Sequence, residues 1–348
     1  MLHIQTKELL LLHLSLNRIT FLRFDEKKLL SKKLDSYYSL ALLSIEEISQ
    51  IVHRPFSKRV VWNGKENLHQ AEVALHYCEL LNIRILLYDD EEYSELLRQI
   101  PDPPYLLFCR GDVSILNKPS VSVVGTRKLS QLGKTSARQF AYDAVLNGCN
   151  VISGLANGAD GYAHQGAVDA FFDASEKNLD LSALGRTIAV IPSSIDQILP
   201  ASHKSLASLI LQTGGCIISE YEPALGMANW HFVGRNRIIA GLSQATVVIE
   251  APCGSGALIT ADFAVDYNRD VMFHASCFMK GAKGISEFVA KELEIKHAAG
   301  QAAKYKIENT VSKFLDAGAK VIKDYNDFCR VLMEPPGIKD IPLQGELF

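Results

Sequence analysis

The sequence has no excess of positive charge. Its 348 residues include 36 Lys and Arg against 39 Asp and Glu, which gives a formal net charge of -3. This balance excludes a strongly basic protein that would attract nucleic acid over its whole surface, so a site for a polyanion must be a local patch. Long apolar runs are also absent: the most apolar stretch near the N-terminus, residues 9–14, is short and contains His13. We predict neither a signal peptide nor a membrane span.

Paired cysteines are missing as well. The seven cysteines are widely spaced, and none belongs to a C-x-x-C pair. This spacing argues against a zinc site and against a disulfide framework. Several cysteines lie in apolar runs, such as Cys216 before Ile217-Ile218, where a free thiol behaves as a small hydrophobic group in a reducing compartment. We predict a cytoplasmic protein that holds no metal and no cofactor.

The first part of the chain has apolar residues at helical spacing, beginning at residues 9–16. Ser44 stands before Glu46-Glu47, as a helix N-cap stands before acidic residues in the first turn. Another helix is expected over about residues 67–81. The pattern breaks at residues 101–104, Pro-Asp-Pro-Pro, because proline removes amide donors and constrains the residue before it. We predict a small helical N-terminal domain over residues 1–85.

After this break, short β-branched runs alternate with glycine-bearing turns and helical stretches. The alternation predicts βαβ units, and hence an α/β fold with a Rossmann-like, doubly wound, mostly parallel sheet over residues 86–330. An insertion at about residues 278–308 is expected to be a helix or a mobile excursion, and residues 331–348 form a C-terminal tail. The expected strands are 120–125, 150–154, 187–191, 216–219, 245–250 and 270–273.

Two glycine-bearing turns follow the first two of these strands. In Gly125-Thr126-Arg127, glycine permits close backbone approach, amides at the next helix can face an anion, and Arg127 adds a planar fork for phosphate oxygens. A tight turn with a solvated arginine is the alternative. The second turn begins with Ser153-Gly154 and is expected to face phosphate in the same crevice; a βα loop that needs glycine for packing is the alternative. Because Arg127 stands where G-x-G-x-x-G has its second glycine, we do not predict NAD binding.

Two later turns show similar chemistry. Residues 232–237, Phe-Val-Gly-Arg-Asn-Arg, open a buried helix with groups suited to phosphate contact and base stacking; a salt-bridged helix start is the alternative. Residues 254–256, Gly-Ser-Gly, close another strand and form a candidate anion nest. Glu250 before them is either a general acid or base or a buried carboxylate that holds loop amides. His164 is expected to be structural.

Together these motifs closely resemble the DprA/Smf family, the DNA processing protein A of bacteria. The resemblance runs from about Tyr88 to Tyr325. It implies a non-enzymatic protein that binds and protects single-stranded DNA, helps to load the RecA recombinase during natural transformation, and forms a homodimer. The motifs that carry it are 124–127, 153–160, 219–221, 235–243 and 254–261.

The resemblance also implies which residues contact DNA. Phe232 is the candidate for base stacking. The family often has an arginine where this chain has Gly254, so the site is expected to be less basic. The residues expected to contact phosphate are Gly125, Thr126, Arg127, Ser153, Gly154, Lys204, Arg235, Asn236, Arg237, Gly254, Ser255 and Gly256.

Two other functions stay open. Phosphoribohydrolases of the same broad Rossmann-like class cleave nucleotides, and Glu220 and Glu250 would be the candidate acids here. However, the P-G-G-x-G-T turn of those enzymes is absent. The third possibility is a scaffold whose N-terminal helical domain recruits partners.

Overall fold

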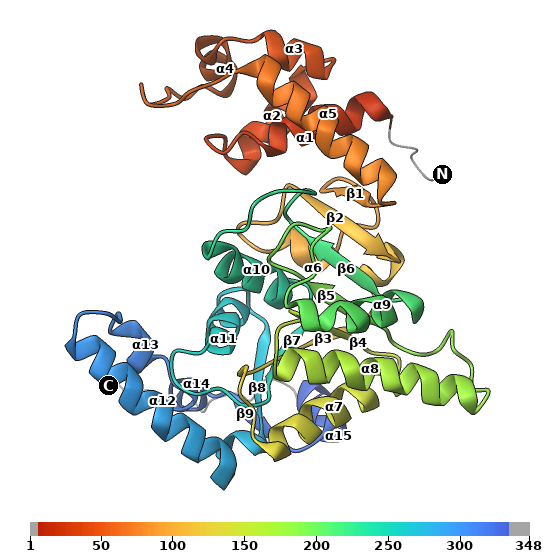
Figure 1. Cartoon of the computed structure of the whole chain (residues 1–348), viewed down its shortest axis with the longest axis vertical. Helices are drawn as coiled ribbons and strands as arrows, with labels where there is room; N and C mark the ends of the chain where they lie inside the picture. The colour runs from red at the N-terminus through yellow and green to blue at the C-terminus, as the bar shows by residue number, and fades with distance from the viewer. Residues whose placement is uncertain (1–5, 334–348) are drawn as a thin grey trace, which may run out of the picture.

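The computed structural model describes residues 6–333. Five helices lie at one end of the molecule, and the remaining helices surround a central sheet (Figure 1). Ser44 caps the fourth helix as expected: its Oγ accepts from the Glu47 amide at 3.2 Å, and the Glu47 carboxylate accepts from the Ser44 amide at 2.7 Å. The five helices are α1 (Lys7–Asn17), α2 (Phe24–Lys33), α3 (Tyr37–Leu42), α4 (Ile45–Val52) and α5 (Gly64–Leu80).

The sheet has nine strands in the order β1-β2-β6-β5-β4-β3-β7-β8-β9. Strands β3 to β9 pair in parallel, whereas β1 and β2 add an antiparallel edge. The prediction of a mostly parallel sheet is confirmed. The strands are β1 (Arg84–Leu87), β2 (Leu106–Gly111), β3 (Ser120–Val124), β4 (Asn150–Ser153), β5 (Thr187–Val190), β6 (Cys216–Ser219), β7 (Ala245–Val248), β8 (Asp270–His274) and β9 (Lys320–Ile322).

Helices cover both faces of the sheet. Side chains on both sides of the central strands are therefore buried. On one face Phe140 and Ala163 pack with Val121, and on the other Ile239 and Leu258 pack with Val124. The helices of this region are α6 (Glu95–Arg98), α7 (Gln131–Leu146), α8 (Ala159–Glu176), α9 (Lys204–Gln212), α10 (Trp230–Gly241), α11 (Gly256–Asp266), α12 (Lys280–Ala298), α13 (Tyr305–Glu308), α14 (Val311–Asp316) and α15 (Tyr325–Met333).

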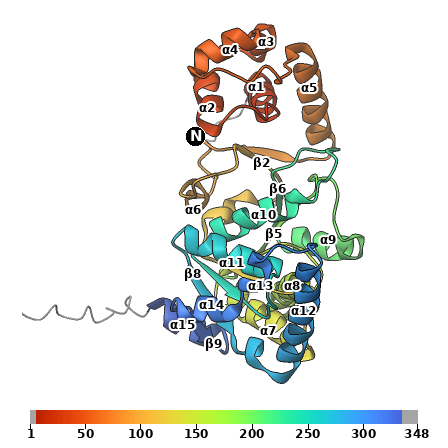
Figure 2. The same ribbon diagram turned by 90° about the vertical axis from the view of Figure 1, so that its left-hand side faces the viewer.

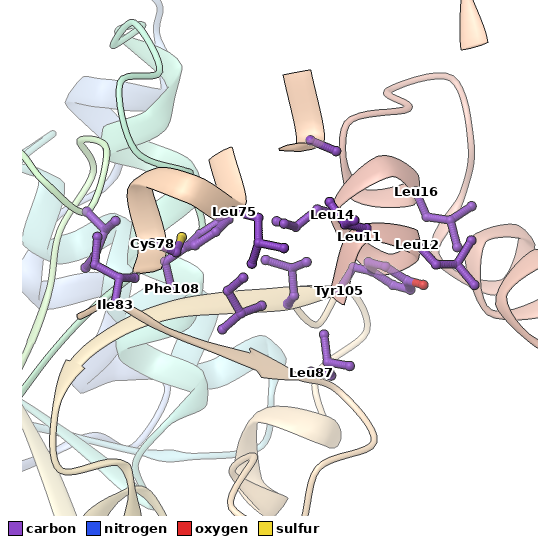
Figure 3. Packing of buried hydrophobic residues seen from close by; sticks show 14 of the residues in the cluster. Leu11, Leu12, Leu14, Leu16, Leu75, Cys78, Ile83, Leu87, Tyr105 and Phe108 are labelled. Carbon is purple, nitrogen blue, oxygen red and sulfur yellow. The ribbon is translucent and has the colours of Figure 1, made fainter. Parts of the chain in front are cut away.

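A single buried cluster joins the N-terminal helices to the sheet. Leu11 and Leu14 of α1 and Leu75 of α5 pack with Tyr105 and Phe108 at the antiparallel edge (Figure 3). Because this cluster includes residues on both sides of residue 85, the division into a helical and a Rossmann-like domain stays a prediction. Figure 2 shows, from a second direction, that the five N-terminal helices lie at one end of the molecule.

The described residues settle two smaller points. Residues 280–298 form α12, so the helical alternative for the predicted insertion is the one observed. The predicted tail begins inside α15, and its residues from 334 on lie outside the described part of the chain. Within residues 6–333, no helix combines the length and the apolar character needed to cross a bilayer.

Candidate nucleic-acid interface

The sheet has a topological switch point beside β3. From β3 the chain continues to β4 on one side, and it later returns to pair β7 with β3 on the other side. Helices that leave β3 and β7 in opposite directions open a crevice at the carboxyl ends of these strands, and ligands of doubly wound folds bind there. The candidate site lies in this crevice.

The turn after β3 supplies one wall. Its Thr126 amide donates to the Glu250 carbonyl at 2.7 Å, and its Thr126 carbonyl accepts from the Ala159 amide at 3.2 Å. A Cβ on Gly125 would lie only 2.6 Å from the Cβ of Ala159, so the close approach of the two segments requires glycine. Arg127 at the end of this turn is exposed, and its guanidinium lies 5.4 Å from the ring centroid of Phe232.

The turn after β7 supplies the second wall. Both Glu250 oxygens accept from Ser130, one from its amide at 2.9 Å and one from its Oγ at 2.5 Å. The carboxylate therefore holds the loop between β3 and α7, which is the second of our two interpretations of Glu250. Glu220, the other candidate acid, accepts from Arg237 at 2.6 Å. The two candidate acids of the enzyme hypothesis are both engaged in these contacts.

Arg235 of α10 is buried and connects the ends of β4 and β5 by hydrogen bonds. One of its nitrogens, Nη1, donates to the carbonyls of Gly154 at 2.6 Å and Val190 at 2.5 Å. Asp160 accepts nearby from the Gly154 amide at 3.1 Å. Burial lowers the pKa of Arg235 to about 10, although the charge of Asp160 opposes the shift. Burial raises the pKa of Asp160, and Arg235 counters that shift in turn.

Five of the expected phosphate ligands have their polar groups engaged within the fold or lie outside the cavity lining. Ser153 is fully buried and donates to the Val123 carbonyl at 2.6 Å, so its hydroxyl is already used inside the fold. Gly154 packs against the Arg235 guanidinium and Arg237 is held by Asp102 and Glu220, so neither lines the crevice. Lys204 opens α9 and likewise lies outside the crevice lining. Arg235 reaches the crevice, but its guanidinium serves the framework.

The other expected residues converge on one cavity of about 470 Å³. Lys128 and Lys306 add positive charge there, and α12 adds an apolar side. The sequence did not lead us to Lys128, Lys306 or the α12 residues. Lys128 directly follows Arg127, so extending the turn by one position would have included it. Expected residues that line the cavity are Gly125, Thr126, Arg127, Phe232, Arg235, Asn236, Gly254, Ser255 and Gly256; additional ones are Lys128, Asp160, Ile285, Val289, Leu293 and Lys306.

His164 is fully buried in α8, as expected of a structural histidine. Its Nδ1 lies 2.7 Å from Thr187 Oγ1, and burial lowers its pKa to about 3. The unfolded histidine has a pKa of about 6.5, so between these values the unfolded chain binds a proton that the folded chain does not. The contribution of His164 to the free energy of unfolding is therefore fully present above pH 6.5 and is lost progressively as the pH falls toward 3.

We expect this histidine alone to cost about 1.4 kcal/mol of unfolding free energy for each pH unit below 6.5. Urea denaturation of the wild type and of His164→Asn between pH 7.5 and 4.5 measures the difference in slope. His76→Asn, on an exposed face of α5, is the matched control and should follow the wild type. Parallel curves for wild type and His164→Asn would contradict the assignment.

The fold and the cavity define a class of protein: a Rossmann-like α/β protein whose switch-point crevice has glycine turns and exposed cations. The family model described as DNA recombination-mediator protein A matches residues 84–330. The chain belongs to this family, which confirms the resemblance to DprA/Smf proteins found in the sequence.

Known relatives agree with this assignment. Protein Smf of Borreliella burgdorferi is 30% identical over 282 residues, which are 81% of this chain and 84% of that protein. DNA processing protein DprA of Streptococcus pneumoniae is 37% identical over 182 residues, 52% of this chain and 59% of that protein. The crystal structure of DNA processing protein A from the same species superimposes with a TM-score of 0.66 at 25% identity, covering 92% of this chain and 97% of that one.

Proposed function

We propose that this chain binds single-stranded DNA in the switch-point cavity. The observation that carries the proposal is the position of Arg127: an exposed guanidinium above the Phe232 ring, at the end of the glycine turn that follows β3. A cation beside an aromatic ring, next to backbone amides at strand ends, is the combination that holds a phosphodiester strand without reading its sequence.

The charges of the cavity set the expected salt dependence. Arg127, Lys128 and Lys306 line it, whereas Arg235 is buried and occupied by carbonyls. Single-strand binding weakens by about 0.7 in log affinity per log salt for each neutralised phosphate, so three cations give a slope near -2. The sequence alone predicts about -3, because it counts roughly four cations by adding Lys204, Arg235 and Arg237 to Arg127.

The family and its relatives support a wider role. Because the family is described as DNA recombination-mediator protein A and relatives are named DNA processing protein DprA, we propose that this chain acts in DNA processing during natural transformation. In this role it protects incoming single strands and helps to load RecA, as a cytoplasmic homodimer that binds DNA and does not chemically alter it. Engagement of Glu220 and Glu250 by Arg237 and Ser130 supports binding over catalysis.

Arg127→Ala is expected to weaken binding of a labelled oligothymidine by about 10- to 100-fold, because a charged hydrogen bond to phosphate contributes about 1.5–3 kcal/mol. It should also make the salt slope less steep by about 0.7. Fluorescence anisotropy with single-stranded and duplex DNA at several salt concentrations measures both quantities. The control is Arg59→Ala, which removes an exposed arginine between α4 and α5 and should bind like the wild type.

The same preparation tests the enzyme hypothesis. Wild type that binds no single strand, but releases base from nucleoside monophosphates, would overturn the proposed function. Equal loss of affinity in Arg127→Ala and Arg59→Ala would leave DNA binding in place but move it away from the crevice.

A further inference from the structure

Helix α12 has an apolar face that belongs to the cavity and not to the core. Ile285, Val289 and Leu293 are spaced four residues apart, so they share one face of the helix. All three line the cavity, and all three side chains are only partly buried. None of them is a member of the three buried clusters found within residues 6–333. Their apolar surface is therefore directed at space that a ligand can fill.

The rest of the cavity lining includes polar and positively charged groups. Arg127 and Lys128 belong to it, and Ser255 stands at the N-cap of α11. The Ser255 Oγ is inaccessible to solvent and has no hydrogen-bond partner among the described residues, so it is a donor or acceptor left over by the fold. Ala257 of α11, Val289 of α12 and Lys306 of α13 line the same cavity, and Figure 1 shows α12 and α13 at the outer left of the molecule.

Segment 299–310 fixes α12 in this place. The Gly254 amide donates to the Asn309 carbonyl at 3.0 Å, and a Cβ on Gly254 would lie 2.7 Å from the Lys306 carbonyl. Asn309 Nδ2 in turn donates to Asp262 of α11 at 2.6 Å. The Gly254 amide is therefore used inside the protein, and so is the Ser255 amide, which donates to the Pro252 carbonyl at 3.2 Å. The expected anion nest is reduced to Gly256 and the Ser255 hydroxyl.

We propose that the α12 face of Ile285, Val289 and Leu293 is the base-contacting wall of the site. The proposal rests on the proposed function: when Arg127 and the strand-end amides hold a phosphate, the attached base lies against this apolar face. An apolar helix face and cationic side chains in one cavity suit the two halves of a nucleotide, and about 470 Å³ lies within the roughly 300–1,000 Å³ of small-ligand sites. A base that is paired and stacked in a duplex would have to leave its stack to reach this face, so contact with α12 favours single strands.

The test compares an oligothymidine with an abasic oligonucleotide of the same length and charge. Wild type should bind the abasic strand about tenfold more weakly, because contacts to a base are lost while every phosphate remains. The variant Val289→Ala/Leu293→Ala should bind oligothymidine about fivefold more weakly than wild type, through loss of apolar contact. Its affinity for the abasic strand and its salt slope should equal those of the wild type.

Ile295→Ala is the control on the same helix, since Ile295 is 71% exposed and does not line the cavity. Alanine favours helix, so circular dichroism should show α12 intact in each variant. Tighter binding by the double variant would mean that α12 obstructs the site, and unchanged binding would mean that it is a bystander; both overturn the proposal. Wild type that binds both strands equally refutes the base contact alone, whereas wild type that binds neither refutes the proposed function.

Discussion

Arg235→Met is expected to lower the free energy of unfolding by about 3–5 kcal/mol, the loss typical when one member of a buried charged network is removed. Methionine fills much of the same volume, so the loss comes from polar groups. The carbonyls of Gly154 and Val190 lose their donor, and the buried Asp160 loses the nearby positive charge. Urea denaturation at pH 7 measures the change.

Asp160→Asn in the Arg235→Met background is the matched control. It removes the uncompensated charge and should recover part of the lost stability, because a neutral amide is less costly to bury than an unpaired carboxylate. Arg237→Met should cost less than Arg235→Met, since the carboxylates of Asp102 and Glu220 that it leaves are partly open to solvent. Equal losses for Arg235→Met and Arg237→Met would show that Arg235 is not the tie between the strand ends.

The central sheet could be predicted from sequence because its strands carry two local signals at once. Runs such as residues 120–124 and 150–153 are short, contain β-branched residues and are followed directly by a glycine. The antiparallel edge gave no such signal. Strand β1 directly follows α5, and β2 follows the proline-rich segment, so their pairing is a long-range contact that no local pattern reports.

The site was predictable in position but less so in the role of each residue. The turns at 125–127 and 254–256 face one crevice because parallel strands end at one edge, which the βαβ pattern implies. Whether an arginine points at solvent or at carbonyls is decided by distant segments. Arg127 and Arg235 look alike in sequence, yet one lies over an aromatic ring and the other ends on β4 and β5 backbone.

Gly158, in the loop after β4, allows this loop to lie in close contact with the turn after β3. Gly158 has φ 86° and ψ -132°, a backbone conformation that only glycine adopts without strain. A Cβ there would lie 2.2 Å from the Thr126 carbonyl and 2.6 Å from the Arg127 Cα. We expect Gly158→Ala to lower the free energy of unfolding by about 3 kcal/mol or more and to displace Arg127, so that DNA affinity falls together with stability.

Substitutions at two other glycines separate backbone strain from steric contact as causes of this loss of unfolding free energy. Gly300 has a φ of 70°, but a Cβ added to it would meet no heavy atom within 4 Å, so Gly300→Ala should show strain alone, about 1 kcal/mol. Gly226 has neither a positive φ nor a close neighbour, and Gly226→Ala should be almost neutral. Thermal or urea unfolding of the three variants gives the ranking. If Gly158→Ala lowers the free energy of unfolding no more than Gly300→Ala does, the loop can move to accept the methyl group. The position of Arg127 would then not depend on this contact.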